Sequence, residues 1–337
     1  MCEEKIKRDM EYCLNCKTKP CQKGCPLSND IPTFIKLAKD GKIEEAYKSL
    51  INTTMLGSIC GRICPHTKQC QGHCVRGIKG EPVNIGKIEA YVFDQAIKNG
   101  YDKKIKKSEI LKGKKIAIIG SGPAGLSCSA FLSIQGADVT IYEKNSKLGG
   151  ILTHGIPDFR IDKKVIESTI SSILNLGIKV EYQQELGKDI TIEELKKSYD
   201  AIFLGLGANI STEMNIEGEN LSGVYGGNTL LEKNEHPNYE GKKVAIVGGG
   251  NVAMDCARTI QRNNPSKVYV IYRRSEKQMP AETKEIEAAK KEGVEFLFQN
   301  NIVKILGKDK VKQIECIKTE LIKIDGEERE VPVNIAV

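Results

Sequence analysis

The sequence predicts an α/β protein in which an all-helical N-terminal domain precedes two Rossmann-like dinucleotide-binding domains. Nine of the twelve cysteines lie in the first 74 residues, and two glycine-rich turns each lie between an apolar strand and a helical stretch. The length of 337 residues fits two or three domains. We place the helical domain at residues 1–105 and the two dinucleotide domains at 113–240 and 241–337.

The composition is that of an ordinary globular protein, with 40% hydrophobic and 28% charged residues. No apolar run approaches 18 residues, and the polar, acidic start has no signal-peptide core. We therefore expect a cytoplasmic protein without a membrane span. The net charge is +7, and lysines gather between Lys103 and Lys115. They indicate a solvated linker or a docking patch for an acidic electron carrier, and not nucleic-acid binding.

The N-terminal cysteines have the spacing of metal ligands. The first group is Cys13, Cys16, Cys21 and Cys25, and the second contains Cys60, Cys64, Cys70 and Cys74. Proline follows Cys25 and Cys64, as in bacterial ferredoxins, and closely spaced thiolates are typical iron–sulfur ligands. A zinc site remains the alternative, but only Cys13 and Cys16 form the Cys-x2-Cys pair that zinc sites favour.

A helical hairpin is expected between the two cysteine groups. Asp30 is a candidate N-cap, Pro32 lies just inside the helix, and Gly41 follows as a stop signal. Apolar residues then recur at helical spacing from Ile43 to Leu50. We interpret these stripes as the core that brings the distant thiols together.

The first glycine-rich turn has a complete βαβ fingerprint. A strand at 115–119 leads into the turn, a helix follows to about Gln135, and a second strand at 138–142 ends at Glu143. The turn contains Gly120, Gly122 and Gly125. They permit a tight turn, a close approach of pyrophosphate, and close helix–strand packing, respectively. Glu143 lies where an acid accepts hydrogen bonds from a ribose hydroxyl.

The second turn repeats this pattern with a different strand end. Strands are expected at 244–247 and 268–272, with a helix between them that runs to about Arg262. The turn contains Gly248, Gly250, Asn251 and Ala253. Arg273 and Arg274 stand where the first motif has its acid, and guanidinium groups pair with phosphates. They favour the 2′-phosphate of NADP(H) over NAD(H), although exposed arginines with no ligand are the alternative.

The chain closely resembles one family along nearly its whole length. The family contains the glutamate synthase small (beta) subunit, the N-terminal part of dihydropyrimidine dehydrogenase and the large subunit of NADH-dependent ferredoxin:NADP oxidoreductase. The resemblance rests on both nucleotide turns and on further stretches, which are Cys13–Pro26, Cys60–Pro65, Glu81–Gly86, Leu148–Gly150, Gly155–Pro157, Phe159–Arg160, Gly205–Ala208, Tyr272–Arg274 and Met279–Ala281.

The resemblance implies FAD in the first dinucleotide domain, with Gly150 among its contacts, and NADP(H) in the second. It also implies two [4Fe–4S] clusters. One cluster takes Cys13, Cys16, Cys21 and Cys74, and the other takes Cys25, Cys64, Cys70 and Glu89. A carboxylate ligand is unusual, so Glu89 as an ordinary surface residue is the alternative. Cys60 and Cys2 are then spare.

By the same resemblance, the chain is an NAD(P)H-dependent oxidoreductase subunit, most like the glutamate synthase small subunit. Electrons pass from NADPH through FAD to the clusters and then to a large partner subunit or an acceptor such as ferredoxin. A ferredoxin:NADP oxidoreductase subunit and a truncated, non-catalytic cofactor-binding module are the alternatives. The chemistry belongs to the cofactors, so no catalytic acid or base is assigned, and His154 is interpreted as structural.

The sequence departs from the family at its C-terminal end. In this family the flavin domain resumes after the inserted nicotinamide domain, and no such segment appears before Val337. We therefore expect a C-terminally truncated flavin domain, because a doubly wound sheet needs its last strand and helix to cover the core. Weak or absent FAD retention is the corresponding expectation.

Overall fold

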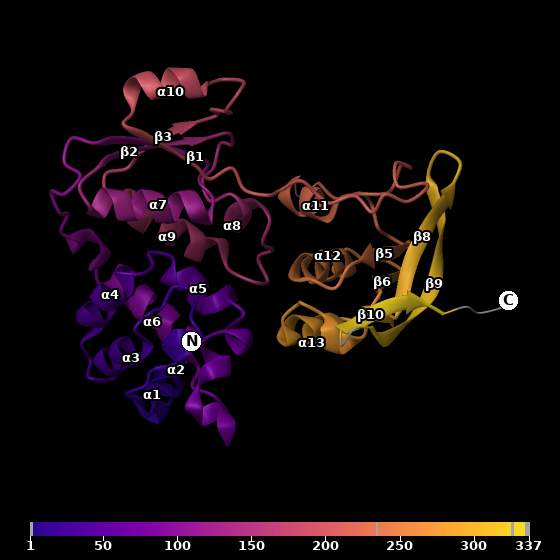
Figure 1. Cartoon of the computed structure of the whole chain (residues 1–337), viewed down its shortest axis with the longest axis horizontal. Helices are drawn as coiled ribbons and strands as arrows, with labels where there is room; N and C mark the ends of the chain where they lie inside the picture. Colours follow the sequence, from indigo (N-terminus) through magenta and orange to yellow (C-terminus); the bar gives the residue numbers. More distant parts are fainter. Residues whose placement is uncertain (1–2, 234, 325–326, 334–337) are drawn as a thin grey trace. The chain divides into compact units, whose positions relative to one another are not determined.

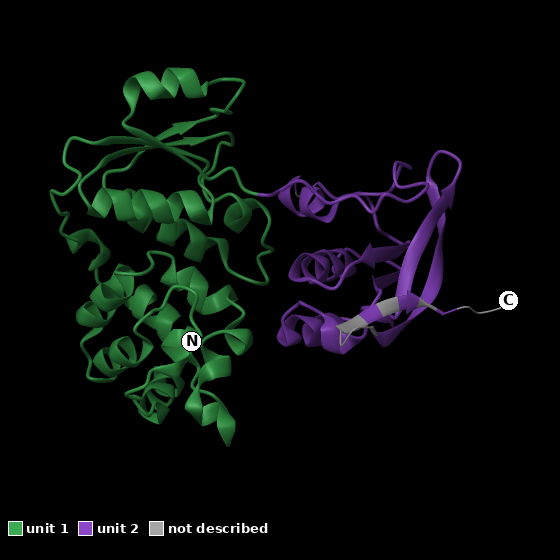
Figure 2. Ribbon diagram, in the orientation of Figure 1, with its two compact units in different colours: residues 1–207 green, residues 208–337 purple. Residues whose placement is uncertain are grey.

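The computed structural model of the chain describes residues 3–233, 235–324 and 327–333. They form two compact units, residues 1–207 and residues 208–337 (Figure 2). Each unit has its own buried apolar clusters. Within the described residues, every helix is too short or too polar to cross a bilayer.

The N-terminal part of the first unit is built of helices, as predicted (Figure 1). They are α1 (Glu3–Tyr12), α2 (Pro20–Lys23), α3 (Ile31–Lys39), α4 (Ile43–Ile51), α5 (Gly57–Ile63) and α6 (Ile85–Lys98), with 3-10 turns η1 (His66–Lys68), η2 (Gln71–His73), η3 (Val75–Ile78) and η4 (Asp102–Lys104). Their core contains Phe34, Tyr47 and Phe93, and the last two rings meet edge to face at 5.1 Å. This packing brings together the chain segments that carry the cysteines.

Helix α3 begins after Asp30 with Pro32 in its first turn, as predicted. The Asp30 side chain makes no capping hydrogen bond, however, and instead accepts a hydrogen bond from Lys19 Nζ at 2.6 Å. Gly41 follows the helix at φ +76°, where a side chain would strain the backbone. The start and stop signals were therefore placed correctly, although the aspartate has a different partner.

The helical region and the first parallel sheet share one core. Helix α5 contacts α9 (Lys163–Leu174), and Met55, Leu56 and Ile59 belong to the same buried cluster as residues of the sheet. On α5, Arg62 forms an ion pair with Asp94 of α6 at 2.6 Å. The thiols that follow α5 are therefore joined to the sheet through packed side chains.

The first sheet is parallel, with strand order β3-β2-β1-β4. Its strands are β1 (Lys115–Ile119), β2 (Asp138–Glu143), β3 (Lys179–Tyr182) and β4 (Ala201–Leu204). Helices α7 (Pro123–Ile134), α8 (Ile151–His154) and α9 lie on one side and α10 (Ile192–Ser198) on the other (Figure 1). β1 and β2 pair in register from Lys115 with Asp138, which places the first glycine turn beside the end of β2.

The second unit contains a parallel and an antiparallel sheet. The parallel sheet, of order β5-β6-β7, contains β5 (Lys243–Val247), β6 (Lys267–Tyr272) and β7 (Glu295–Phe298), with helices α11 (Gly227–Lys233), α12 (Asn251–Gln261) and α13 (Thr283–Lys291) and the 3-10 turn η5 (Glu276–Gln278). The antiparallel sheet, of order β10-β9-β8, contains β8 (Asn300–Gly307), β9 (Val311–Ile324) and β10 (Glu327–Pro332). The nucleotide strands and helices were predicted to within a few residues, whereas the antiparallel sheet was not predicted.

Residues 208–240 belong to the second unit, although the sequence placed them with the first dinucleotide domain. Met214, Ile216 and Leu221 pack against Ile302 and Ile305 of β8. Helix α11 contacts α12, and its Leu230 is buried in the core of the parallel sheet. The unit therefore begins near residue 208, because these apolar side chains are buried against the second sheet pair.

Candidate cofactor and cluster sites

Four cysteines line one apolar pocket in the helical region. They are Cys13, Cys16, Cys21 and Cys74. Ile31, Ile35 and Ile85 complete its walls. Two left-handed residues, Asn15 (φ 48°) and Lys19 (φ 47°), turn the chain so that its thiols face a common space. Four soft donors around one dry pocket fit a thiolate-bound iron–sulfur cluster.

Burial and mutual repulsion make two of these thiols, Cys13 and Cys21, resist ionisation while no metal is bound. Burial, with a smaller contribution from the neighbouring Cys13 and Cys74, raises the pKa of Cys21 to about 11. Burial also raises the pKa of Cys13, and Arg76 partly offsets this effect. Such thiols become ligands when a cationic metal centre displaces their protons.

Three further cysteines and a carboxylate converge more deeply in the fold. Burial raises the pKa of Cys70 to about 12, and the charges of Glu89, Cys25 and Cys64 add to it. Glu89 is 5% exposed, and burial followed by repulsion from Cys64 raises its pKa to about 8. Glu89 is therefore not a surface residue. It faces the same space as the second set of thiols.

Two polar residues that the sequence did not reveal hold Glu89 in place. The buried Asn29 donates from Nδ2 to Glu89 Oε1 at 3.2 Å, and Thr53 Oγ1 donates to Asn29 Oδ1. The contact joins residues that are 60 positions apart, so no local pattern could have predicted it. It restricts the carboxylate to one orientation.

The remaining cysteines have different surroundings. Cys60 lies against Cys64, and this contact and burial raise its pKa well above the usual value. Cys128 on α7 is half-buried, and Cys256 on α12 is buried. Cys2 lies outside the described residues. The thiols surround pockets rather than a point, and among the described residues no three His, Cys, Asp or Glu side chains meet closely enough to share one metal ion.

The first glycine turn has the geometry expected of a dinucleotide loop. A Cβ at Gly120 would lie 2.4 Å from Gly205 O, and one at Gly125 would lie 1.9 Å from Gly120 O. A Cβ at Gly122 would meet nothing within 4 Å, and α7 begins immediately after it. Two glycines therefore allow the backbone to pack, while the third leaves open space at a helix N-terminus, where unpaired N–H groups attract phosphate.

Glu143 is fixed at the end of β2 before any ligand binds. It is 3% exposed, and its Oε2 accepts hydrogen bonds from Ser121 Oγ and from Ser121 N at 2.9 Å. Its Oε1 accepts one from Asn145 N at 2.9 Å, which leaves further lone pairs for a ribose hydroxyl. Ser121 Oγ also accepts a hydrogen bond from Gly149 N at 3.0 Å. The sequence predicted the acid but not the serine that connects it to the next loop.

The loop that contains Gly149 and Gly150 packs against the first glycine turn. Gly150 has φ +52°, and a Cβ there would lie 2.9 Å from Gly122 Cα, so the two glycines lie against each other. Lys163 supports the segment by donating to Thr153 O at 2.9 Å and to Ile156 O. His154 is half-buried at the end of α8, and its Nε2 makes no hydrogen bond within the described residues. The loop therefore adds a second wall beside the open space at Gly122.

The second glycine turn is similar in backbone but looser in packing. Gly248 has φ +130°, and its Cβ position lies 3.6 Å from the side chain of Ala253, an ordinary contact. A Cβ at Gly250 would meet nothing within 4 Å, and α12 begins immediately after it. Asn251 Oδ1 accepts a hydrogen bond from Glu282 N at 3.0 Å. This turn therefore also offers open space at a helix N-terminus.

Arg273 and Arg274 follow β6, as predicted, with Arg273 exposed and Arg274 half-buried. Their backbones are held from outside β6, since Arg273 O accepts from Thr319 Oγ1 of β9 at 2.6 Å and Arg274 O accepts from Gln299 N, between β7 and β8, at 3.1 Å. The antiparallel sheet thus supports the segment that presents both guanidinium groups.

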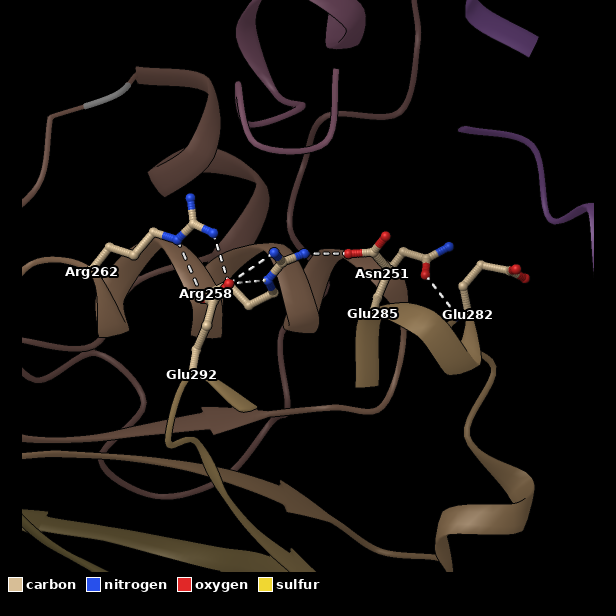
Figure 3. Close-up of polar contacts among 6 residues, drawn as sticks. All are labelled: Asn251, Arg258, Arg262, Glu282, Glu285 and Glu292. Atoms are coloured by element: carbon tan, nitrogen blue, oxygen red, sulfur yellow. Dashed lines mark hydrogen bonds and ion pairs between the residues drawn. The ribbon is translucent and has the colours of Figure 1, made fainter. Parts of the chain in front are cut away.

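An ion-pair network connects α12 to α13 (Figure 3). Arg258 pairs with Glu285, and its other nitrogen pairs with Glu292 at 2.9 Å. Arg262 pairs with the same Glu292 oxygen at 2.7 Å. Because Glu282 binds Asn251 at the start of α12, both ends of α12 are connected to the α13 segment (Figure 3).

Comparisons with known proteins match the two regions of the chain that contain these candidate sites. Residues 1–101 match the family described as dihydropyrimidine dehydrogenase domain II, 4Fe-4S cluster, and residues 114–336 match the pyridine nucleotide-disulphide oxidoreductase family. The glutamate synthase [NADPH] small chain of Escherichia coli is 35% identical over 97% of this chain and 72% of its own length. The NADPH-Fe(3+) oxidoreductase subunit beta of Geobacter sulfurreducens is 36% identical over 94% of this chain and 48% of its own length.

Among solved structures, Mycobacterium tuberculosis FprA in complex with NADPH matches with a TM-score of 0.60 at 18% identity. The match covers 66% of this chain and 67% of FprA. A 2-naphthoyl-CoA reductase complex matches 90% of this chain and 44% of its own chain, with a TM-score of 0.53 at 19% identity. At these identities the structures show a shared fold.

Proposed function

This chain belongs to the glutamate synthase small-chain family, and we propose that it is an NADPH-dependent oxidoreductase subunit that holds FAD and two [4Fe–4S] clusters. One observation carries the proposal. Cys13, Cys16, Cys21 and Cys74 line one pocket, while Cys25, Cys64 and Glu89 all lie near enough to Cys70 to affect its ionisation. Cys60 also lies beside Cys64 and Glu89, so the second group offers five potential ligands, of which the family resemblance assigns the other four. A single structural metal ion needs only four ligands in all.

The position of the two sets suggests the direction in which electrons travel. Cys64 caps α5, the helix that packs against α9 beside the first sheet. The set around Cys13 includes the exposed segment at Leu14, which is 50% exposed. We therefore assign the Cys64 set to the inner cluster, near the flavin domain, and the Cys13 set to the outer cluster.

The first dinucleotide loop is assigned to FAD and the second to NADP(H). Gly122 and Gly250 leave room for pyrophosphate, and Glu143 retains acceptor capacity for a ribose hydroxyl. Arg273 and Arg274 are assigned to the 2′-phosphate. When bound, a flavin converts between the electron pair of a hydride and the single electrons that iron–sulfur clusters carry.

Relatives of this chain are subunits of larger assemblies, as their names state. We propose that this chain also works with a partner, either a large subunit or a separate electron carrier. The NADPH-Fe(3+) oxidoreductase and NADP(+)-dependent formate dehydrogenase relatives show that the same chain type occurs with different reactions. Glutamate synthesis is therefore one of several reactions that a partner could specify.

Anaerobic isolation tests the cofactor assignment. Two [4Fe–4S] clusters require about eight irons and about eight acid-labile sulfides per chain. Cys21→Ser and Cys70→Ser should each remove about half of the iron, and the double variant nearly all of it. Cys128→Ser is the matched control, because Cys128 lies on α7, and it should retain full iron. A wild-type chain that binds zinc but neither iron nor sulfide would contradict the proposal.

NADPH oxidation tests the electron path separately. In the chain supplied with FAD, NADPH should bleach the flavin band and then the broad cluster absorption near about 400 nm. Cys70→Ser should leave flavin bleaching intact but prevent reduction of the outer cluster. Cluster reduction that persists in this variant would refute the assigned order.

A further inference from the structure

We propose that the loops around the outer cluster pocket form the docking surface for an acidic protein with an exposed one-electron redox centre. This inference rests on the proposed function, and it names the type of partner and the surface that binds it. We call this surface the thiol rim, and define it as residues 12–28 and 65–80. These two segments carry Cys13, Cys16, Cys21 and Cys74, which line the outer pocket.

The thiol rim has a charge of one sign. It contains six basic residues and neither aspartate nor glutamate, although the whole chain has 44 acidic residues against 51 lysines and arginines. The basic residues are Lys17, Lys19, Lys23, Lys68, Arg76 and Lys79. Other stretches without acidic residues exist, such as residues 256–275, but the thiol rim combines this absence with the cysteines that line the outer pocket. A surface of one sign steers and orients a partner of the opposite sign.

Part of this charge surrounds one hollow beside the outer pocket. Lys17, Lys19 and Lys23 line an open surface hollow, and Cys16 and Cys21, on the same loop, line the cluster pocket. Lys19 is paired with Asp30, but within the described residues Lys17 and Lys23 are exposed and form no ion pair. Two ammonium groups therefore remain available to carboxylates of another protein.

Apolar side chains are exposed within the same loops. Leu14 is 50% exposed, Leu27 is 47% exposed and Ile78 is 77% exposed, although most large apolar side chains of this region are buried. Arg76, whose guanidinium lies 4.2 Å from the ring centre of Tyr12, adds a flat amphipathic surface. Exposed apolar groups surrounded by charge are typical of sites that bind proteins.

The cluster pocket beside the thiol rim favours a partner that has a redox centre over an acidic protein that has none. Its four thiols are all half-buried, whereas the inner set contains the buried Cys70 and Glu89 beside the half-buried Cys25 and Cys64. A partner on the thiol rim would therefore lie nearer to the outer site, which has no fully buried ligand. The lysines between Lys103 and Lys115 lie outside both cysteine loops, so they are the less favoured docking patch.

Binding to a redox-inert carrier tests the docking surface without relying on turnover. The cluster-loaded full chain would be titrated with a gallium-substituted acidic [2Fe–2S] ferredoxin at low and physiological ionic strength. The double charge reversal Lys17→Glu and Lys23→Glu should raise the Kd about ten-fold at low salt and flatten its dependence on salt. Lys17→Gln and Lys23→Gln together should give an intermediate increase.

Lys106→Glu and Lys107→Glu form the matched control, because they make the same charge change in the linker, where both side chains are exposed. This control should change the Kd less than about two-fold. Basic cytochrome c should show the opposite effect: the Lys17→Glu and Lys23→Glu double variant should bind it more tightly than the wild type does.

Two results would overturn the proposal. One is an equal change of Kd in the rim and linker variants, and the other is a Kd that none of the variants changes. Iron content of each variant reports whether the rim variants still hold their clusters. Because no NADPH enters this experiment, failure of the docking surface is distinct from failure of the proposed electron path.

Discussion

The two glycine turns share a backbone design but differ in how tightly they are packed. In the first, a Cβ at Gly125 would lie 1.9 Å from Gly120 O. In the second, the equivalent position is Ala253, whose Cβ lies 3.6 Å from the Cβ position of Gly248. The first turn therefore has no room for a side chain at its third glycine position, whereas the second accommodates the methyl group of Ala253. The same sequence motif permits two packing distances, and only the first requires a glycine at its third position.

The acidic and basic strand ends also differ in their surroundings. Glu143 is buried and hydrogen-bonded to Ser121 and Asn145, so it stabilises the loop itself. Arg273 is exposed, and its backbone oxygen accepts a hydrogen bond from Thr319 of β9. The residues at the two equivalent strand ends therefore differ in burial as well as in charge.

The largest expected effect comes from Gly125→Ala. The added methyl would collide with a backbone oxygen that cannot move without disrupting the turn, so unit 1 should lose about 3 kcal/mol of unfolding free energy. Urea denaturation followed by hydrogen exchange, which reports on each unit separately, measures this loss. Gly122→Ala is the matched control and should cost less than about 0.5 kcal/mol, because its Cβ would meet open space. Equal losses in the two variants would contradict the packing difference.

Glu143→Ala should cost unit 1 about 2 kcal/mol. The substitution leaves the N–H groups of Ser121 and Asn145 without their acceptor in a buried site. Thermal unfolding of the flavin-free chain is the measurement, so that ligand loss does not contribute. A fully stable variant would show that the carboxylate serves only the ribose.

Replacing both Arg273 and Arg274 with alanine should weaken NADPH binding about 10- to 100-fold. The expected loss follows from removing charge-assisted hydrogen bonds to the 2′-phosphate. NADH, which lacks that phosphate, provides the internal control and should bind as in the wild type. Nucleotide titrations of both cofactors measure the ratio, and a proportional loss of NADH affinity would argue for a general structural role.

The smallest expected effect concerns the ion-pair network behind the second turn. Burial alone would raise the pKa of Glu292, but hydrogen bonds from Arg262 and Arg258 outweigh it and lower that pKa below its usual 4.5. The carboxylate therefore stabilises unit 2 above about pH 4.5, and this contribution is lost as the pH falls through the lowered pKa.

Glu292→Gln should accordingly cost about 1 kcal/mol near pH 7, a modest value because the carboxylate stays partly open to solvent. The difference from wild type should shrink below about pH 4.5. Denaturation curves of unit 2 at several pH values measure it. Glu276→Gln is the control, since Glu276 pairs with Lys290 in an exposed position, and it should have little effect at any pH.

The local parts of both sites could be predicted from the sequence. Glycine positions, helix starts and strand ends depend on residues only a few positions apart, so β1, α7, β2 and their counterparts in the second unit were found. The antiparallel sheet was missed although β9 carries apolar residues such as Ile314 and Cys316 that pack on β8. Its strands bear no glycine or cysteine signature, and their alternation is interrupted by bulges in the β8–β9 register.

By itself, the sequence determined the fold class, the two nucleotide turns and the residue types available as ligands, because each depends on local spacing. Only the tertiary structure decided which cysteines share a pocket, that Asn29 holds Glu89, and that Ser121 connects Glu143 to the following loop. The hydrogen bonds among them join residues 22 to 60 positions apart. Their formation depends on how helices and sheets pack, which local periodicity does not encode.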